Sequence, residues 1–269
     1  MSDPLQLKIR HQTRYAFENP TSAGVQQLRK TPKPTRGQHV ATWATTVEGG
    51  RKELQFTDHH RNCVELVSFA AGVTSVMIGG EGVVEVTDTG GLVGPHEGPA
   101  PLWLYRGDTD QTRPGDGCRD LIRQIGEDDE IARLHELSSL IRSLVRYETG
   151  STESHWSAEE VIAEARGVCQ DHAHVFIACA RLLGFPARYV SGYLMLDDRT
   201  VQDAMHAWAE AHVEGAGWIG FDISNGISPD ARYVRVATGL DYAEAAPVTG
   251  LRYGEGVESL TTSLEVVQQ

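Results

Sequence analysis

The sequence of 269 residues has no apolar run of about 18 residues, which is the length that a membrane-spanning helix needs. It also opens without a basic segment followed by an apolar one, so we expect no signal peptide. Basic residues are fewer than acidic ones: the sequence has 24 Lys and Arg and 37 Asp and Glu, so its formal net charge is −13. So acidic a surface repels phosphate and anionic lipid, and we therefore expect neither nucleic acid nor a membrane as a partner.

Cysteines are few, and no two of them form a CxxC pair: Cys63, Cys118, Cys169 and Cys179. This usage is typical of reduced thiols and not of a disulfide framework, so we expect a cytoplasmic protein. Metal-binding patterns are weak as well. His172 and His174 are two residues apart on a predicted helix and would point to different faces, so we expect no metal and no cofactor.

The first hundred residues predict strands. From Leu5 to Phe17 apolar and aromatic residues alternate with polar ones, which is the pattern of a strand with one buried face. Further β-rich runs occur at 40–47, 63–69, 73–78 and 83–86, and glycine pairs at 49–50, 79–80 and 90–91 predict turns. A stretch rich in Pro and Gly at 94–101 predicts a boundary, so we expect a β-rich N-terminal domain over residues 1–100.

The spacing of apolar residues becomes helical after this boundary, at 121–125 and 131–145. Ser157 and Glu160 form a capping-box pattern that predicts a helix to about residue 166. A second helix is expected over 169–183, ended by Gly184, and strands follow at 187–196, 205–213 and 218–223. The prediction is an α+β protein in which residues 101–269 form a helix-then-sheet core with C-terminal strands.

Cys169 would open the second of these helices. The partial positive charge of a helix N-terminus favours a thiolate, and its backbone N–H groups can stabilise an oxyanion on an attacked carbonyl. The alternative is a small buried cysteine on an apolar helix face, which suits Cys179 in the same helix.

His206 and Asp222 lie on two strands that form a predicted hairpin. A three-residue turn at 214–216 would pair Val213 with Gly217, and the odd-numbered residues of both strands are apolar. His206 and Asp222 then share the opposite face as diagonal neighbours within side-chain reach. A carboxylate that orients an imidazole is two-thirds of a catalytic triad. The alternative is an unrelated His and Asp on the surface of a sheet.

Three ordered segments carry these residues: RGVCQDHAHVFIACARLLGFPARYVSGYL, HAWAEAHV and GWIGFDISNG. Together they resemble the transglutaminase-like superfamily of thiol enzymes, whose core is similar to that of papain-type proteases. The segment IRHQTRYAF resembles the N-terminal region of bacterial transglutaminase-like proteins. Where many relatives read FDPTNG this chain reads FDISNG, a departure that we expect not to touch the triad.

The resemblance implies a nucleophile at a helix N-terminus, packed on an antiparallel sheet. By motif, Cys169 matches the nucleophile, His206 the general base and acid, and Asp222 the residue that orients the histidine. The implied function is thiol-dependent acyl transfer from an amide through a thioester, as a cysteine peptidase, amidase or transglutaminase acting on a peptide or protein. The alternative is a catalytically silent binding or scaffold protein with the same fold.

Several details stay open at this stage. Tyr147 and Trp156 are candidates for a side-chain donor to the oxyanion, and Trp208 and Trp218 either line a substrate groove or pack in the interior. No obvious insertion between Cys169 and the hairpin could build a lid, so we expect hydrolysis to exceed transfer to an amine. The acyl donor, the acceptor and the oligomeric state are not specified by the sequence.

Overall fold

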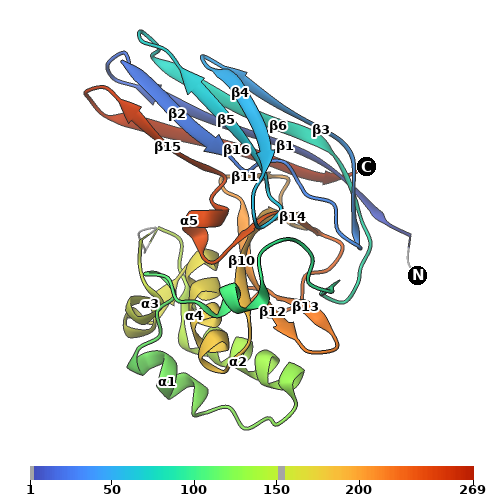
Figure 1. Ribbon diagram of the computed structural model, residues 1–269. Coiled ribbons are helices and arrows are strands. Elements are labelled where there is room, and N and C mark those ends of the chain that lie inside the picture. The colour runs from blue at the N-terminus through green and yellow to red at the C-terminus, as the bar shows by residue number, and fades with distance from the viewer. Residues whose placement is uncertain (1–2, 151–154) are drawn as a thin grey trace.

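The computed structural model describes residues 3–150 and 155–269, and the expected α+β class is confirmed. Long strands form one half of the molecule, and helices gathered around a further sheet form the other half (Figure 1). Neighbouring strands pair antiparallel in all three of the larger sheets among these residues. No helix in the described ranges combines the length and the apolar character that a bilayer span requires.

The N-terminal half is a sandwich of two sheets. The strands of the first sheet are, in order, β11 (Val201–Gln202), β16 (Glu258–Gln268), β1 (Leu5–Phe17), β6 (Ser75–Val86) and β3 (Gln38–Glu48). The strands of the second sheet are β15 (Val248–Tyr253), β2 (Ala23–Leu28), β5 (Cys63–Phe69) and β4 (Arg51–Thr57). Their inner faces share an apolar core in which the rings of Phe17 and Phe69 stack at 5.9 Å.

The C-terminal strands belong to this sandwich. Strand β16 pairs with β1 from Leu7 to Phe17, and β15 pairs with the whole of β2. The chain therefore leaves the sandwich, forms the helical half and returns to the sandwich at its end. The division at residue 100 stays a prediction, because strands from both sides of it pair with one another in all three of the larger sheets.

Strand β6 runs without a break through Gly79 and Gly80, where the glycine pair predicts a turn, so that prediction is wrong. A Cβ on Gly80 would lie 3.0 Å from the ring of Trp43 on β3. Gly80 therefore lets an aromatic ring lie directly against the backbone of the strand. The glycines at 49–50 do form the predicted turn between β3 and β4, where Gly49 has a φ of +76°.

The third sheet has the strand order β14 (Tyr233–Gly239), β10 (Ala187–Leu194), β12 (His206–Val213), β13 (Gly217–Phe221) and β7 (Leu92–Gly94). The helices around it are η1 (Leu102–Arg106), α1 (Asp116–Ile122), α2 (Glu130–Leu144), α3 (Ala158–Glu164), α4 (Cys169–Leu182) and α5 (Tyr242–Ala245). The predicted capping box of Ser157 and Glu160 begins α3. Helix α4 is buried along most of its length and packs on β12, which gives the antiparallel sheet its helical cover.

One face of β1 serves two apolar cores. Tyr15 and Phe17 contact the sandwich core, whereas Leu7 and Ile9 contact the larger core that α4 and the third sheet share. The alternation of apolar and polar residues along β1 predicts one buried face. It does not show that one part of this face packs on the sandwich core and the other part on the larger core. The strand therefore fixes the sandwich against the helical half.

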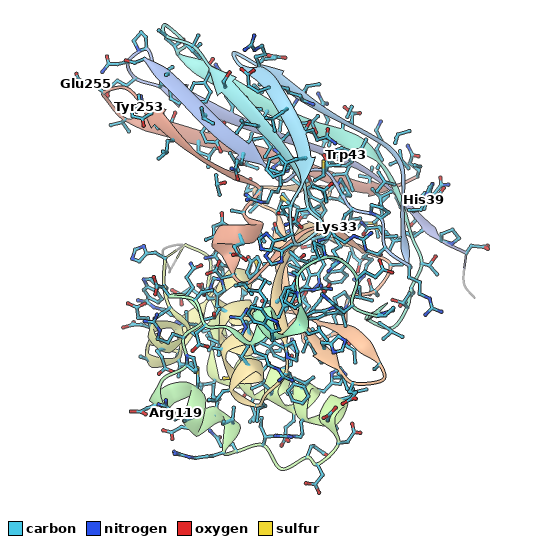
Figure 2. All side chains as sticks on the ribbon, viewed as in Figure 1. Lys33, His39, Trp43, Arg119, Tyr253 and Glu255 are labelled. Atoms are coloured by element: carbon cyan, nitrogen blue, oxygen red, sulfur yellow. The ribbon has the colours of Figure 1, made fainter. Side chains whose placement is uncertain are left out.

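Buried polar side chains lie between these two cores. Lys30 Nζ donates to Thr13 Oγ1 at 2.9 Å, and Lys33 Nζ donates to Asn62 Oδ1 at 2.8 Å and to Thr238 Oγ1 at 2.7 Å. Lys33 lies at the junction of the two halves in Figure 2. Burial lowers the pKa of Lys30 to about 7 and that of Lys33 well below its usual value. These amines therefore serve as hydrogen-bond donors inside the junction.

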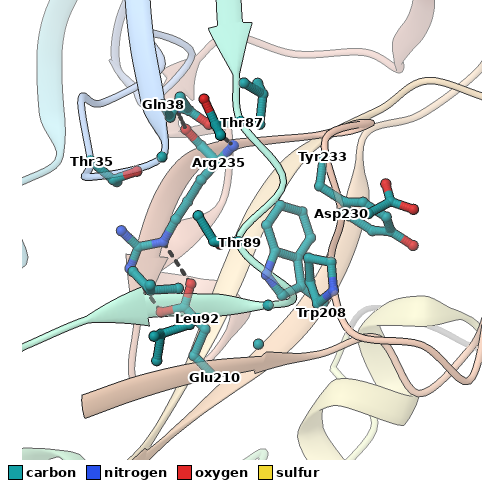
Figure 3. Close-up of a pocket in the computed structure, with 16 residues that line it drawn as sticks. Thr35, Gln38, Thr87, Thr89, Leu92, Trp208, Glu210, Asp230, Tyr233 and Arg235 are labelled. Atoms are coloured by element: carbon teal, nitrogen blue, oxygen red, sulfur yellow. Dashed lines mark hydrogen bonds and ion pairs between the residues drawn. The ribbon is translucent and has the colours of Figure 1, made fainter. Parts of the chain in front are cut away.

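A buried ion triplet crosses the third sheet beside this junction. Glu210 on β12 lies between Arg188 Nε, 2.6 Å from its Oε2, and Arg235 Nε, 2.7 Å from its Oε1. Figure 3 shows Glu210 with Arg235. Burial by itself would raise the pKa of Glu210, but the two arginines outweigh burial and lower the pKa. The ionised carboxylate therefore neutralises two buried guanidinium groups.

Replacing Glu210 with Gln should lower the free energy of unfolding by about 3–5 kcal/mol, because two buried guanidinium groups would lose their counter-ion. Urea denaturation followed by circular dichroism at pH 7 measures this loss. Asp116→Asn is the matched control, since Asp116 forms an exposed ion pair with Arg119, and it should change stability far less. Equal losses in the two variants would contradict the role given to the triplet.

Candidate active site

Cys169 is the first residue of α4, as the sequence predicts. Asp171 Oδ2 accepts a hydrogen bond of 2.8 Å from the backbone N–H of Val168, which caps the helix and fixes its first turn. A Cβ on Gly167 would lie 2.7 Å from the Cβ of Asp171, so a glycine is needed where the chain enters the helix. The side chain of Cys169 is partly exposed and can meet a substrate.

The hairpin of β12 and β13 has the predicted register, with Val213 opposite Gly217. Ala209 lies opposite Phe221, and both side chains pack into the larger core. Asp222 follows β13 directly and His206 begins β12. Their side chains meet, because His206 Nε2 lies 2.6 Å from Asp222 Oδ2.

Asp222 is fully buried and accepts hydrogen bonds from three side chains. His206 Nε2, Tyr233 Oη and Asn225 Nδ2 lie 2.6, 2.7 and 2.7 Å from its Oδ2. Burial by itself would raise the pKa of Asp222, but the hydrogen bonds and the charge of His206 outweigh it and lower the pKa. The carboxylate is therefore ionised and held in one orientation.

The imidazole of His206 lies between this carboxylate and the thiol of Cys169. Burial by itself would lower the pKa of His206, whereas hydrogen bonds with Asp222 and Cys169, and the charges of both, raise it to about 10. Since Nε2 faces Asp222, Nδ1 is the ring nitrogen left for the thiol. The three residues that the sequence singles out are thus brought together, with the imidazole between the carboxylate and the thiol.

Trp208 and Trp218 are both buried, which favours the interior-packing alternative, and Trp208 also lines the cavity of Figure 3. Trp208 is 2% exposed, stacks against His206 with ring centroids 6.3 Å apart and meets Tyr233 edge-on. Trp218 is 1% exposed and lies under the guanidinium of Arg188, 3.6 Å from the ring centroid. Trp208 therefore shields the histidine and its carboxylate from water.

A second histidine anchors the loop that follows Asp222. His172 Nε2 lies 3.0 Å from the carbonyl oxygen of Val145, and its Nδ1 lies 2.8 Å from Ser224 Oγ. Nε2 must donate to the carbonyl, so Nδ1 accepts the serine proton. Burial lowers the pKa of His172 and keeps the ring neutral for this bridge. The departure from FDPTNG thus falls on Ser224, which bonds His172, and on Ile223 in the apolar core.

Three residues of the site, Asn225, Tyr233 and His172, are not predicted by the sequence to take part in it. Asn225 lies in the segment SNG directly after the aspartate, which was a local signal for a turn around the carboxylate. Tyr233 and His172 left no such signal, because they reach the site from β14 and α4. His174, the other member of the HxH pattern, accepts from the backbone N–H of Tyr242 and does not converge with His172 on one point.

Tyr147 lies close to the start of α4. It pairs with Gly167 in the short parallel pair of β8 (Arg146–Tyr147) and β9 (Arg166–Gly167), just before α4. Burial raises the pKa of Tyr147, and the negative charges of Cys169 and Asp222 raise it further. Trp156, the other candidate donor, packs against the larger core.

Two family models match the chain. The transglutaminase-like superfamily matches residues 119–223, and the bacterial transglutaminase-like N-terminal region matches residues 7–85. An uncharacterized protein of Mycobacterium leprae is 27% identical over 97% of this chain and 98% of its own length. One of Mycobacterium bovis is 39% identical over 50% of this chain and 46% of its own length.

The fold is also known from a solved structure. A proposed cysteine protease from Cytophaga hutchinsonii superposes with a TM-score of 0.80 at 24% identity, over 99% of this chain and 91% of that one. The match to the transglutaminase-like superfamily covers α4 and the hairpin. The match to the N-terminal region covers most of the sandwich. Residues 119–223 therefore match the transglutaminase-like superfamily, and residues 7–85 ahead of them match the bacterial transglutaminase-like N-terminal region.

Proposed function

We propose that this chain is a thiol enzyme that hydrolyses amide bonds of peptides or proteins, with Cys169, His206 and Asp222 as its catalytic triad. The observation that carries the proposal is the buried bond between Asp222 and His206, next to the thiol that opens α4. A carboxylate, an imidazole and a nucleophile in this order form the arrangement by which thiol and serine enzymes transfer acyl groups.

The first half of the reaction forms a thioester. The Cys169 sulfur attacks the amide carbon, and the carbonyl oxygen takes up the electron pair as an oxyanion near the N-terminal turn of α4. Tyr147 is our candidate for a further donor to this oxygen, because it lies close to the start of α4. As the C–N bond breaks, His206 gives its proton to the leaving amine, and the raised pKa of His206 keeps that proton available at neutral pH.

The second half releases the acid. A water molecule attacks the thioester carbon while His206 accepts a proton from it, and the Cys169 sulfur leaves as the acyl group becomes a carboxylic acid. Asp222 holds the ring in one orientation through both halves, because its own position is fixed by Tyr233 and Asn225. This division of roles explains why the carboxylate is buried while the thiol is partly exposed.

We also propose a reducing compartment, the cytoplasm, as the place where this chemistry occurs. All four cysteines are free thiols in the structure, which suits a cytoplasmic protein more than a secreted one.

Iodoacetamide should alkylate Cys169 near neutral pH well before the other three cysteines. Cys118 and Cys179 are buried, and burial raises the pKa of the Cys63 thiol, so only Cys169 has a cationic imidazole beside it. Peptide mapping by mass spectrometry over time measures the order. His206→Ala should slow the labelling of Cys169 by at least about tenfold while leaving Cys63 unchanged. Equal labelling of all four cysteines would favour the catalytically silent alternative.

His206 should be an imidazolium at pH 7 and should lose its proton only as the pH approaches about 10. In Asp222→Asn the charge of the carboxylate is lost, so the pKa of His206 should fall towards about 6.5. Nitrogen NMR of labelled histidine side chains follows both titrations. His39→Ala, which removes an exposed histidine elsewhere, should leave the His206 titration unchanged. A neutral His206 at pH 7 in the unaltered chain would contradict the proposed mechanism.

Hydrolysis should exceed transfer to an amine. A site that favours an amine over water must exclude water, and only β10 and the two-residue strand β11, which pairs with β16, lie between α4 and the hairpin, which leaves little chain for a lid. Mass spectrometry of a glutamine-containing peptide pool with a millimolar primary amine measures both products. Cys169→Ala should give neither product, and an excess of amine-coupled peptide would identify a transglutaminase activity.

A further inference from the structure

A second cluster of chemically active side chains lies away from the thiol, where the sandwich meets α5. His59 and His60 end the turn between β4 and β5, and Glu244 lies in α5. Each of the three offers one ligand atom, and these atoms all lie within 4.8 Å of one another. Ligands about 2.1 Å from a tetrahedral ion lie about 3.4 Å apart, so a small movement closes the cluster around one ion.

We propose that His59, His60 and Glu244 bind one divalent transition-metal ion of the zinc class. Two imidazoles and one carboxylate are a ligand set that Zn²⁺ accepts in proteins, with water in the remaining position. Ca²⁺ and Mg²⁺ prefer oxygen ligands alone, so the two nitrogen donors favour a transition metal.

The two inner ligands are already oriented. His60 Nε2 lies 2.8 Å from Glu244 Oε2, and the other ring nitrogen, Nδ1, lies 2.9 Å from the hydroxyl of Tyr105. When Nε2 binds an ion, Nδ1 must carry the proton and donate it to Tyr105. Such a bond from the far nitrogen orients metal-binding histidines in general.

The carboxylate is already held in place. Glu244 Oε2 lies 2.8 Å from His60 Nε2 and accepts a hydrogen bond of 2.7 Å from the backbone N–H of Leu240.

The cluster is open to solvent on one side and fixed on the other. The side chain of His60 is 1% exposed and that of Glu244 is 37% exposed, while His59 is exposed and can turn towards an ion. The backbone N–H of His60 donates to Asp58 Oδ1 at 2.9 Å, which holds the turn. An ion can thus enter from the solvent-exposed side, where His59 lies, without disturbing the core.

A bound ion would join the sandwich to α5. That helix is in turn tied to α4, because the backbone N–H of Tyr242 donates to His174 Nε2 at 3.1 Å. The ion would therefore raise the stability of the junction on which the orientation of the helical half depends.

Isothermal titration of the full chain with ZnCl₂, after removal of metals with EDTA, tests the proposal. All proteins carry Cys169→Ala, so that the accessible thiol cannot bind zinc, and circular dichroism verifies their folding. We expect one ion per chain and a rise in melting temperature. His59→Ala and Glu244→Gln should each weaken binding by at least about 100-fold, and Tyr105→Phe by about tenfold.

His39→Ala is the control, because it removes an exposed histidine of β3 that lies outside the cluster (Figure 2). It should leave the affinity and the melting temperature with zinc unchanged. Two results would overturn the proposal: no binding by the Cys169→Ala parent, or equal affinity in the parent and in folded His59→Ala. Either would show that His60 and Glu244 form an ion pair only.

Discussion

The buried carboxylate of Asp222 is the constraint on which the site depends. A charge without solvent contact is stable only if other groups neutralise and hydrogen-bond it, and three side chains do so here. They come from β12, from the loop after β13 and from β14, so one charge fixes three segments of chain. His172 adds α4 to this arrangement through Ser224, and the thiol at the start of α4 is thereby held in register with the imidazole.

The sandwich is joined to this site more closely than a separate domain would be. A single face of β1 packs on both cores, and the chain closes both sheets of the sandwich with its last two strands. Between the two cores lie buried lysines and the triplet of Glu210, Arg188 and Arg235, whose charges and donors are all directed at particular partners. Buried polar groups of this kind fix one orientation of the sandwich relative to the helical half, because any other orientation would leave them without hydrogen-bond or ion-pair partners.

Local patterns predicted those features of the chain that depend on neighbours in sequence. The capping box of Ser157 and Glu160, the start of α4 at Cys169 and the register of the hairpin all follow from short-range geometry. The juxtaposition of His206 with Asp222 followed from the register, because parity decides which face a strand residue occupies. The turn predicted at the glycine pair of β6 is wrong, because glycine is favoured both in a turn and where Trp43 lies against the backbone of Gly80.

The sequence by itself determined most of the elements, the cysteine at a helix start and the pairing of an imidazole with a carboxylate. Only the tertiary structure decided what surrounds them: Tyr233 on the carboxylate, Trp208 over the histidine, and the meeting of His59 and His60 with Glu244. These groups come from segments far apart in the chain, and their contacts depend on how sheets and helices pack. The physical reason is that periodicity specifies which face a residue takes, whereas packing specifies which distant residue it meets.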